Sequence, residues 1–264
     1  MSSGNQLFQE RVEREREAHS ESDVLAESYK IKEHFYHIRC YPSIKRLYNK
    51  MEEYVSEIEG KKILDLGCGF GEQSLTFLKR GAIVYGIDIS PNYIDHATQQ
   101  ALTAGFLKDD FSFKVMDAHT LEFENDTFDI VIGYGILHHL DYKITLGEVH
   151  RVLKPGGRAL FQECLADNPL LKLFRVLTPD ARTVDEKPFS NKDIQIIVES
   201  GLWHAEMMYC GLVCAPIAVF TSLMLRPYPD NPLIRFADHI EKWTHTRSLF
   251  LSWNQYVLFN LVKC

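Results

Sequence analysis

The feature that most constrains this chain is a glycine-rich turn between an apolar run and the start of a helix. Residues 63–71 read Ile-Leu-Asp-Leu-Gly-Cys-Gly-Phe-Gly, and a helix is expected from about Glu72. Glycines let the backbone approach a ligand closely, and a helix N-terminus adds free N–H donors. A second apolar run ends in Asp88, seventeen residues after Gly71, about where α/β sheets place a carboxylate on a ribose. The pattern predicts an α/β fold that binds a nucleoside-containing cofactor.

The spacing and charge of this turn favour one cofactor class over another. A nicotinamide or flavin site uses G-x-G-x-x-G, with its third glycine on the helix. Here the glycines are closer together, at Gly67, Gly69 and Gly71, and Asp65 precedes them. A carboxylate at that position would repel pyrophosphate but could orient a cation. S-adenosylmethionine carries a sulfonium and an ammonium group and no phosphate, so the charges favour it.

Further motifs give a specific family resemblance. The glycine turn and Asp88 are followed by the run Phe-Asp-Ile-Val-Ile-Gly-Tyr-Gly-Ile-Leu-His-His-Leu at 128–140 and by Glu-Val-His-Arg-Val-Leu-Lys-Pro-Gly-Gly at 148–157. With these four motifs in the family's order, the segment from about Gly60 to Glu163 resembles the class I S-adenosylmethionine-dependent methyltransferases.

Strand and helix patterns alternate along the core, which predicts a parallel sheet with helices on both faces. Strands are expected near 62–67, 82–88, 111–116, 128–133, 157–163, 203–209 and 252–262, and helices near 72–80, 91–105, 142–153 and 190–200. The resemblance implies a doubly wound, Rossmann-like seven-stranded sheet, mostly parallel, whose last strand is antiparallel.

Two regions stand outside this core, which is expected over 60–264. Residues 1–59 predict an N-terminal helical arm and lid, with helices on both sides of Pro42 that either close over the cofactor or pack against the sheet. Insertions at about 165–190 and 211–248 predict a helical cap over the strand C-termini, because long insertions in a compact domain are usually functional.

The composition indicates which binding partners and which cellular compartment to expect for this chain. The formal net charge is −7, which argues against a nucleic-acid backbone as the main partner. Six scattered cysteines form no C-x-x-C pair, so we expect no metal site and a reducing, cytoplasmic location. The longest apolar run, 211–225, contains Pro216 and is too short to span a bilayer. Whether the chain forms a homo-oligomer through the N-terminal helix or the cap stays open.

The resemblance implies a cofactor-binding set at the carboxyl ends of the strands. Asp65 and the glycines would lie along the methionine part, and Asp88 would accept from the ribose hydroxyls. Asp117 would read the adenine edge, and the Gly133 carbonyl would face the ammonium group. The full set is Asp65, Gly67, Cys68, Gly69, Gly71, Asp88, Ile89, Met116, Asp117, Ala118 and Gly133.

The candidate catalytic residues follow the fourth strand. Methyl transfer depends largely on alignment and exclusion of water, and needs a base only where the acceptor must lose a proton. Some small-molecule members of the family place a His-His pair here with a carboxylate at the end of the next strand, which implies His138, His139 and Glu163. One histidine would accept or orient the acceptor proton with support from Glu163. Alternatively, at least one histidine only packs or caps the helix that begins near Asp141.

The expected activity is S-adenosylmethionine-dependent methylation of a small lipophilic or aromatic metabolite, on oxygen, nitrogen or carbon. Candidate acceptor-pocket residues are Tyr29, Tyr36, His37, Tyr41 and Tyr134. Three alternatives remain open: methylation of a macromolecule, a non-catalytic cofactor-binding partner protein, and a nicotinamide oxidoreductase.

Overall fold

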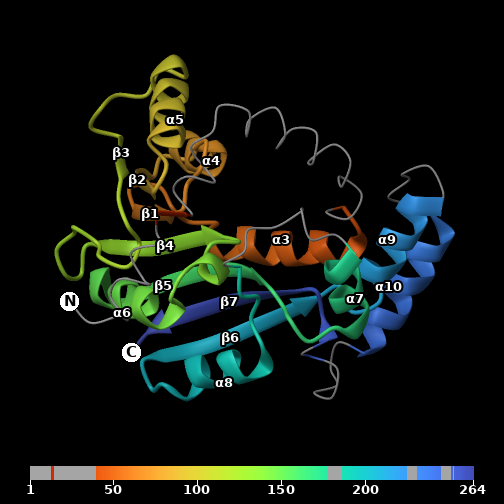
Figure 1. Ribbon diagram of the computed structural model, residues 1–264. Helices are drawn as coiled ribbons and strands as arrows, with labels where there is room; N and C mark the ends of the chain where they lie inside the picture. The colour runs from red at the N-terminus through yellow and green to blue at the C-terminus, as the bar shows by residue number, and fades with distance from the viewer. Residues whose placement is uncertain (1–12, 15–39, 178–185, 225–230, 245–250, 252) are drawn as a thin grey trace.

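A seven-stranded mixed sheet forms the centre of the computed structural model, which describes residues 13–14, 40–177, 186–224, 231–244, 251 and 253–264 (Figure 1). The strand order is β3-β2-β1-β4-β5-β7-β6. The strands are β1 (Lys62–Leu66), β2 (Ile83–Asp88), β3 (Phe111–Val115), β4 (Phe128–Tyr134), β5 (Leu153–Cys164), β6 (Trp203–Cys210) and β7 (Tyr256–Lys263). Only β7 runs antiparallel to its neighbours, β5 and β6. The predicted sheet, including its antiparallel last strand, is therefore confirmed.

Helices cover both faces of the sheet because successive strand residues point to opposite sides. Ile63 belongs to the core cluster on one face, and its neighbour Leu64 belongs to the cluster on the other. The helices of the sheet layers are α3 (Pro42–Tyr54), α4 (Glu72–Lys79), α5 (Pro91–Thr103), α6 (Tyr142–Val152) and α8 (Asn191–Glu199). Helices α3, α4 and α5 pack on the first face, and α6 and α8 pack on the second.

Local signals fix where two of these helices begin. Asp141 accepts a hydrogen bond from the backbone N–H of Lys143 and caps α6. Ser190 and Asp193 form a capping box at the start of α8, in which each side chain bonds the other residue's backbone N–H. Both starts lie within two residues of the expected positions.

Helix α3, which lies in the N-terminal region, is a core element. Its residues Ile44, Leu47 and Met51 are buried, and the helix contacts β6 and a helix of the second insertion. Arg80, just after α4, bonds Glu52 and the carbonyl of Val55, which ties the end of α3 to the sheet domain. This helix therefore packs against the sheet. The helix predicted before Pro42 lies outside the described residues, and so do Tyr29, Tyr36 and His37.

The two insertions contribute helices near the carboxyl end of the sheet. The first carries α7 (Pro169–Leu177), and the second carries α9 (Cys214–Met224) and α10 (Pro232–Thr244). Helices α9 and α10 lie beyond the end of β6, pack on each other, and reach α3 through α10 (Figure 1). None of the helices in the described part of the chain is long and apolar enough to cross a membrane.

A buried carboxylate joins the two helices of the second insertion. Glu241, on α10, accepts hydrogen bonds from the backbone N–H groups of Gly211, Val213 and Cys214, at 2.6, 3.2 and 2.9 Å. These are donors at the start of α9 that have no partner within that helix. One side chain thus caps α9 and fixes its position against α10.

Replacing this carboxylate tests the packing of the second insertion. We expect Glu241→Ala to lower the free energy of unfolding by roughly 2 kcal/mol, because buried N–H donors would lose their acceptor. Chemical denaturation measures the effect. Glu57→Ala, at an exposed glutamate, is the matched control and should be neutral. Equal stability of the two variants would contradict the capping role.

Candidate active site

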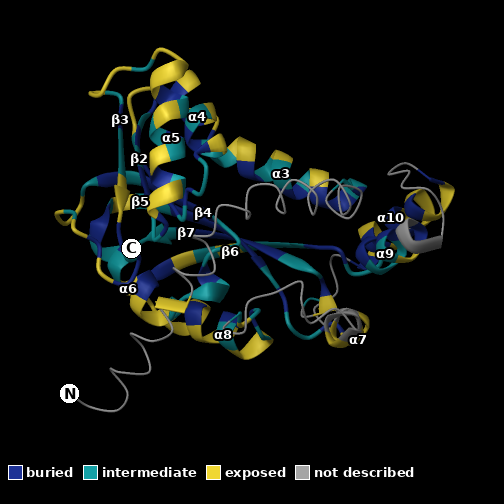
Figure 2. Cartoon of the chain, turned by 45° about the horizontal axis from the view of Figure 1, so that its top comes forward, coloured by how far each residue is buried: buried dark blue, intermediate teal, exposed yellow. Residues whose placement is uncertain are grey.

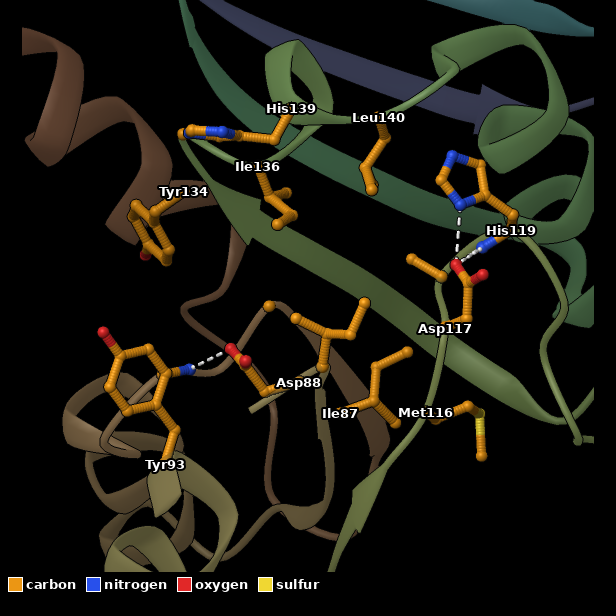
Figure 3. A pocket seen from close by; sticks show the side chains of 15 residues that line it. Ile87, Asp88, Tyr93, Met116, Asp117, His119, Tyr134, Ile136, His139 and Leu140 are labelled. Carbon is orange, nitrogen blue, oxygen red and sulfur yellow. Dashed lines mark hydrogen bonds and ion pairs between the residues drawn. The ribbon is translucent and has the colours of Figure 1, made fainter. Parts of the chain in front are cut away.

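A pocket opens where the strand order reverses, between β1 and β4, at the carboxyl ends of the strands (Figure 3). Such a reversal leaves a crevice in open α/β sheets, because the connections on either side of it leave in opposite directions. The pocket is lined by Gly67, Gly69, Ile87, Asp88, Ile89, Tyr93, Met116, Asp117, Ala118, His119, Tyr134, Gly135, Ile136, His139 and Leu140.

The glycine turn is hydrogen-bonded to the end of β2. The backbone N–H groups of Gly67 and Cys68 both donate to the carbonyl of Ile87, at 2.9 Å. One oxygen of Asp88 accepts from the N–H of Gly69 at 3.0 Å, and the other accepts from the N–H of Ser90 at 3.0 Å. These bonds hold the Asp88 carboxylate at the pocket wall and fix the turn beside it.

Gly67 also brings the turn close to the segment after β4. Its φ of +73° lies in the left-handed region, and a Cβ there would come within 2.7 Å of the Ile136 side chain. Glycine is therefore required both by the backbone conformation and by the packing. This contact places the glycine turn directly against the residues that precede the two histidines.

Asp65 is a buried acid behind the glycine turn. It is 2% exposed and accepts a hydrogen bond of 2.6 Å from the hydroxyl of Ser74 on α4. Burial raises the pKa of its carboxyl to about 6, although the bond from Ser74 works in the opposite direction, and the nearby charge of Asp88 adds to the rise. A positive charge bound at the pocket would stabilise the ionised form of Asp65.

Asp117 is held by a histidine that the sequence analysis did not identify. One oxygen of Asp117 accepts from the backbone N–H of His119 at 2.9 Å and lies 2.6 Å from Nδ1 of its ring. The other ring nitrogen, Nε2, accepts from the backbone N–H of Asp141 at 2.9 Å. The neutral tautomer with its proton on Nδ1 satisfies both bonds. His119 therefore fixes the Asp117 carboxylate and ties it to the start of α6.

Glu163 organises the short helical turn after β4, residues Leu137–His139. The side chain is fully buried and accepts from the backbone N–H groups of Ile136 and Leu137 at 3.1 and 2.8 Å. Its second oxygen lies 2.7 Å from Nδ1 of His138. Burial alone would lower the pKa of His138, but hydrogen bonds to Cys164 and Glu163 and the negative charge of Glu163 raise it to about 11. His138 therefore keeps its proton at neutral pH.

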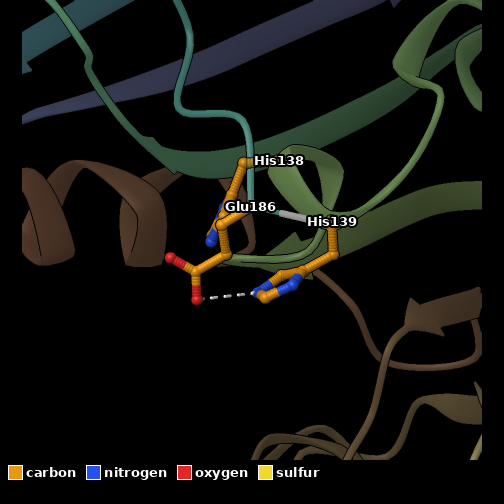
Figure 4. A group of neighbouring side chains, drawn as sticks. All are labelled: His138, His139 and Glu186. Atoms are coloured by element: carbon orange, nitrogen blue, oxygen red, sulfur yellow. Dashed lines mark ion pairs between the residues drawn. The ribbon is translucent and has the colours of Figure 1, made fainter. Parts of the chain in front are cut away.

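The two histidines take different positions. His139 lines the pocket, whereas the lining does not include His138. The rings stay in contact, with centroids 4.3 Å apart. Nε2 of His139 lies 3.8 Å from a carboxylate oxygen of Glu186 (Figure 4). His138 has a raised pKa and its Nδ1 is bonded to Glu163, so it is suited to holding the turn. His139 lines the pocket, so it is placed to contact a ligand.

His138, His139 and Glu186 are also the described residues that come closest to a metal-binding trio. Their ligand atoms lie within 4.8 Å of one another. Neighbouring ligands of a tetrahedral zinc ion are roughly 3.3 Å apart, since each lies at about 2.0 Å from the metal. With 3.8 Å between Nε2 of His139 and the carboxylate of Glu186, these side chains are spaced more widely than zinc ligands, so we assign no metal to them.

Nine of the site residues expected from the sequence line this pocket. Those in the lining are Gly67, Gly69, Asp88, Ile89, Met116, Asp117, Ala118, Tyr134 and His139. Asp65, Cys68, Gly71, Gly133, His138 and Glu163 are absent from the lining and stand in the structure that supports it. The described part of α7, α9 and α10 contributes no residue to the lining.

One expected pocket residue lies elsewhere. Tyr41 is fully buried in the core cluster that includes α3, and its hydroxyl donates to Gln255 at 2.8 Å. It is a packing residue, because its ring precedes α3 and is covered by the second insertion and the segment before β7. The lining residues that were not expected from the sequence are Ile87, Tyr93, His119 and Leu140. The spacing of Asp117 and His119 was the one available signal for His119.

Comparisons with known proteins find a methyltransferase domain in this chain. Residues 64–161 match the family model described as "Methyltransferase domain". A demethylmenaquinone methyltransferase from Lactococcus lactis is 34% identical over 130 residues, covering 48% of this chain and 50% of that protein. A ubiquinone biosynthesis O-methyltransferase from Coxiella burnetii is 35% identical over 109 residues, covering 39% and 44%. The chain thus spans about half the length of these curated relatives.

A solved structure extends the likeness to most of the chain. Geranyl diphosphate C-methyltransferase from Streptomyces coelicolor, in complex with Mg2+, geranyl diphosphate and S-adenosyl-L-homocysteine, has a TM-score of 0.58 and 15% identity. The match covers 84% of this chain and 81% of that one. At this identity the likeness shows a shared fold.

Neutralising Glu163 tests how the histidine turn is held. We expect His138 not to titrate between about pH 6 and 8, because its pKa lies well above that range. In Glu163→Gln the pKa of His138 should fall clearly, because the hydrogen bond to a charged carboxylate and its negative charge are both lost. Nuclear magnetic resonance of the ring protons measures both. Breaking the buried pair should also cost roughly 3 kcal/mol of stability.

Glu57→Gln, at an exposed glutamate, is the matched control for this variant. A His138 resonance whose titration is the same in wild type and Glu163→Gln would show that Glu163 does not hold the proton.

Proposed function

We propose that this chain, which carries a class I S-adenosylmethionine-dependent methyltransferase domain, methylates a small lipophilic or aromatic molecule with S-adenosylmethionine as the donor. One observation carries the proposal: His139 lines the same pocket as two fixed carboxylates, Asp88 and Asp117. A cofactor held by the carboxylates and an acceptor next to the histidine would share this pocket.

The charged side chains that line the pocket fit S-adenosylmethionine. Its described lining contains two carboxylates and no lysine or arginine, which disfavours a pyrophosphate-containing cofactor. Asp88 would accept from the ribose hydroxyls, and Asp117 with Ala118 would contact the adenine edge. The glycine turn, with Asp65 behind it, would lie along the methionine part. When bound, this cofactor supplies a methyl group already activated by its sulfonium.

The chain's own residues then have separate tasks. His139 would accept or orient the proton of the acceptor group, because its imidazole lines the pocket and can act as a general base. His138 holds its proton too tightly for that role and, with Glu163, positions the turn that carries His139. The apolar lining residues Ile136 and Leu140 would help to exclude water from the reacting groups.

The proposed class of methyl acceptor is inferred from the names of similar proteins and from the apolar lining of the pocket. The curated relatives act in menaquinone and ubiquinone biosynthesis by name, and the structural neighbour binds geranyl diphosphate. All of these molecules pair a reactive head with an apolar part. The relatives include both O- and C-methyltransferases, so the methylated atom stays open. All six cysteines are free, which supports a reducing compartment such as the cytoplasm.

Removing the imidazole of His139 tests the catalytic assignment. The wild-type protein should methylate at least one member of a panel of short-chain demethylated quinols, prenylated phenols and geranyl diphosphate. Mass spectrometry would detect the added methyl group. We expect His139→Ala to lower kcat by about 100-fold or more, because a positioned acid–base group contributes that much. Cofactor affinity should change little.

His204→Ala, at an exposed histidine on β6, is the matched control and should keep full activity. Wild-type turnover by His139→Ala on the same acceptor would remove His139 from the mechanism.

Asp65 gives the cofactor site a pH dependence. Since its pKa in the free protein is about 6, acidification neutralises it and removes its attraction for a cationic ligand. We expect affinity for S-adenosylmethionine to be flat above about pH 7 and to fall roughly tenfold by pH 5. Calorimetric titration measures this.

The Asp65→Asn variant separates this effect from other titrating groups. It should bind the cofactor weakly at every pH and lose most of the dependence. The same pH dependence in wild type and Asp65→Asn would show that Asp65 does not sense the cofactor's charge.

A further inference from the structure

Helix α10 presents an apolar stripe to the outside of the molecule. Leu233, Phe236, Ile240 and Trp243 recur at i, i+3, i+7 and i+10, which places them on one face of a helix. All four are exposed, and Phe236 and Trp243 are 68% and 62% exposed. The opposite face, with Ile234 and Ala237, is buried against the rest of the protein. The exposed stripe contributes nothing to the described core, and apolar surface of this kind marks interaction sites.

Charge is sorted between the two faces of this helix. Its two acids both point inward: Asp238 pairs with Arg46 at 2.7 Å and with Lys242 at 2.9 Å, and Glu241 caps α9. Both acids are less than 10% exposed. The ionisable residues on its exposed side are Arg235, His239 and Lys242. A chain with a net charge of −7 thus has a helix face on which large apolar side chains are flanked by basic side chains, one of which, Lys242, also pairs with Asp238.

Helix α7 repeats the pattern at the same end of the molecule (Figures 1 and 2). Its described side chains are all exposed: Leu170, Leu173 and Val176 share one face, and Lys172, the charged residue among them, lies 3.7 Å from the carboxylate of Asp167. Asn168, just before α7, bonds the backbone of Trp253, whose ring is also exposed. Two separate insertions therefore expose apolar residues with basic neighbours.

We propose that α10, together with α7, docks this protein onto the surface of a bilayer that contains anionic lipids. Apolar stripes with aromatic residues and flanking lysine or arginine lie in the membrane interface, where the apolar part enters the acyl boundary and the cations meet anionic headgroups. No described helix spans a membrane, so the contact is peripheral.

A second copy of the chain is a poorer occupant of the same surface. A two-fold symmetric contact would place the stripe of one copy against that of the other. Arg235 of both copies would then lie at the same interface, and like charges brought together oppose association. Anionic headgroups remove this repulsion, which favours the lipid surface.

Binding of the full chain to vesicles tests the proposal without cofactor or acceptor, so methyl transfer and docking can fail separately. Sedimentation with vesicles of phosphatidylcholine plus about 30% phosphatidylglycerol should pull down the wild-type protein, and phosphatidylcholine alone should retain far less. Salt should weaken the binding. The fluorescence of Trp243 should shift to the blue on binding, and Trp243→Phe should reduce that shift.

The double variant Leu233→Asn/Phe236→Asn should bind the anionic vesicles at least about tenfold more weakly, because it removes the apolar part of the contact. Its folding should be unaffected, since both side chains are exposed. Leu107→Asn, at a leucine that is 69% exposed in the loop between α5 and β3, is the matched control and should bind like wild type.

Three results would overturn the proposal: no binding to anionic vesicles, equal binding by the double variant, or equal binding to vesicles without anionic lipid. A concentration-dependent dimer in analytical ultracentrifugation that the double variant abolishes would assign the stripe to a second copy instead.

Discussion

The buried carboxylate of Glu163 is the interaction on which the site depends most. It has no contact with solvent, and two backbone N–H groups and the ring of His138 donate to it. An uncompensated charge at that depth would be costly, so the turn after β4 must keep the shape that supplies these donors. That shape sends His138 inward and leaves His139 in the pocket. The arrangement of the two histidines is therefore a consequence of satisfying one buried anion.

Carboxylates play a similar part elsewhere in the protein. Asp88 accepts from two backbone N–H groups and fixes the glycine turn, and Glu241 accepts from three and fixes the start of α9. Asp117 is held by both the backbone and the ring of His119. Charge-assisted bonds of this kind are stronger than neutral ones and define the position of a loop. The loops that form the pocket are thus held in place by carboxylates that accept backbone hydrogen bonds.

Sequence patterns predicted the sheet and its order of elements well, because strand alternation, the glycine turn and helix caps are local signals. They also located Asp88 and Asp117, which follow directly from the ends of strands. They could not separate His138 from His139, because that distinction depends on where Glu163 lies in the folded sheet. Tyr41 was assigned to the pocket wrongly, since its burial is set by Gln255 and the second insertion, more than 160 residues away in the chain. The exposed stripe of α10 depends on the inward turn of Asp238 and Glu241, which only the folded contacts reveal.

A crystal structure with S-adenosyl-L-homocysteine is the most direct measurement of the central claim, that this pocket holds the cofactor and presents His139 to the acceptor. We expect ribose density at Asp88, adenine at Asp117 and Ala118, and a sulfur atom that faces the His139 side of the pocket, with the bond between Glu163 and His138 unchanged. Density for the ligand at another place, or His138 in the pocket with His139 turned away, would contradict it.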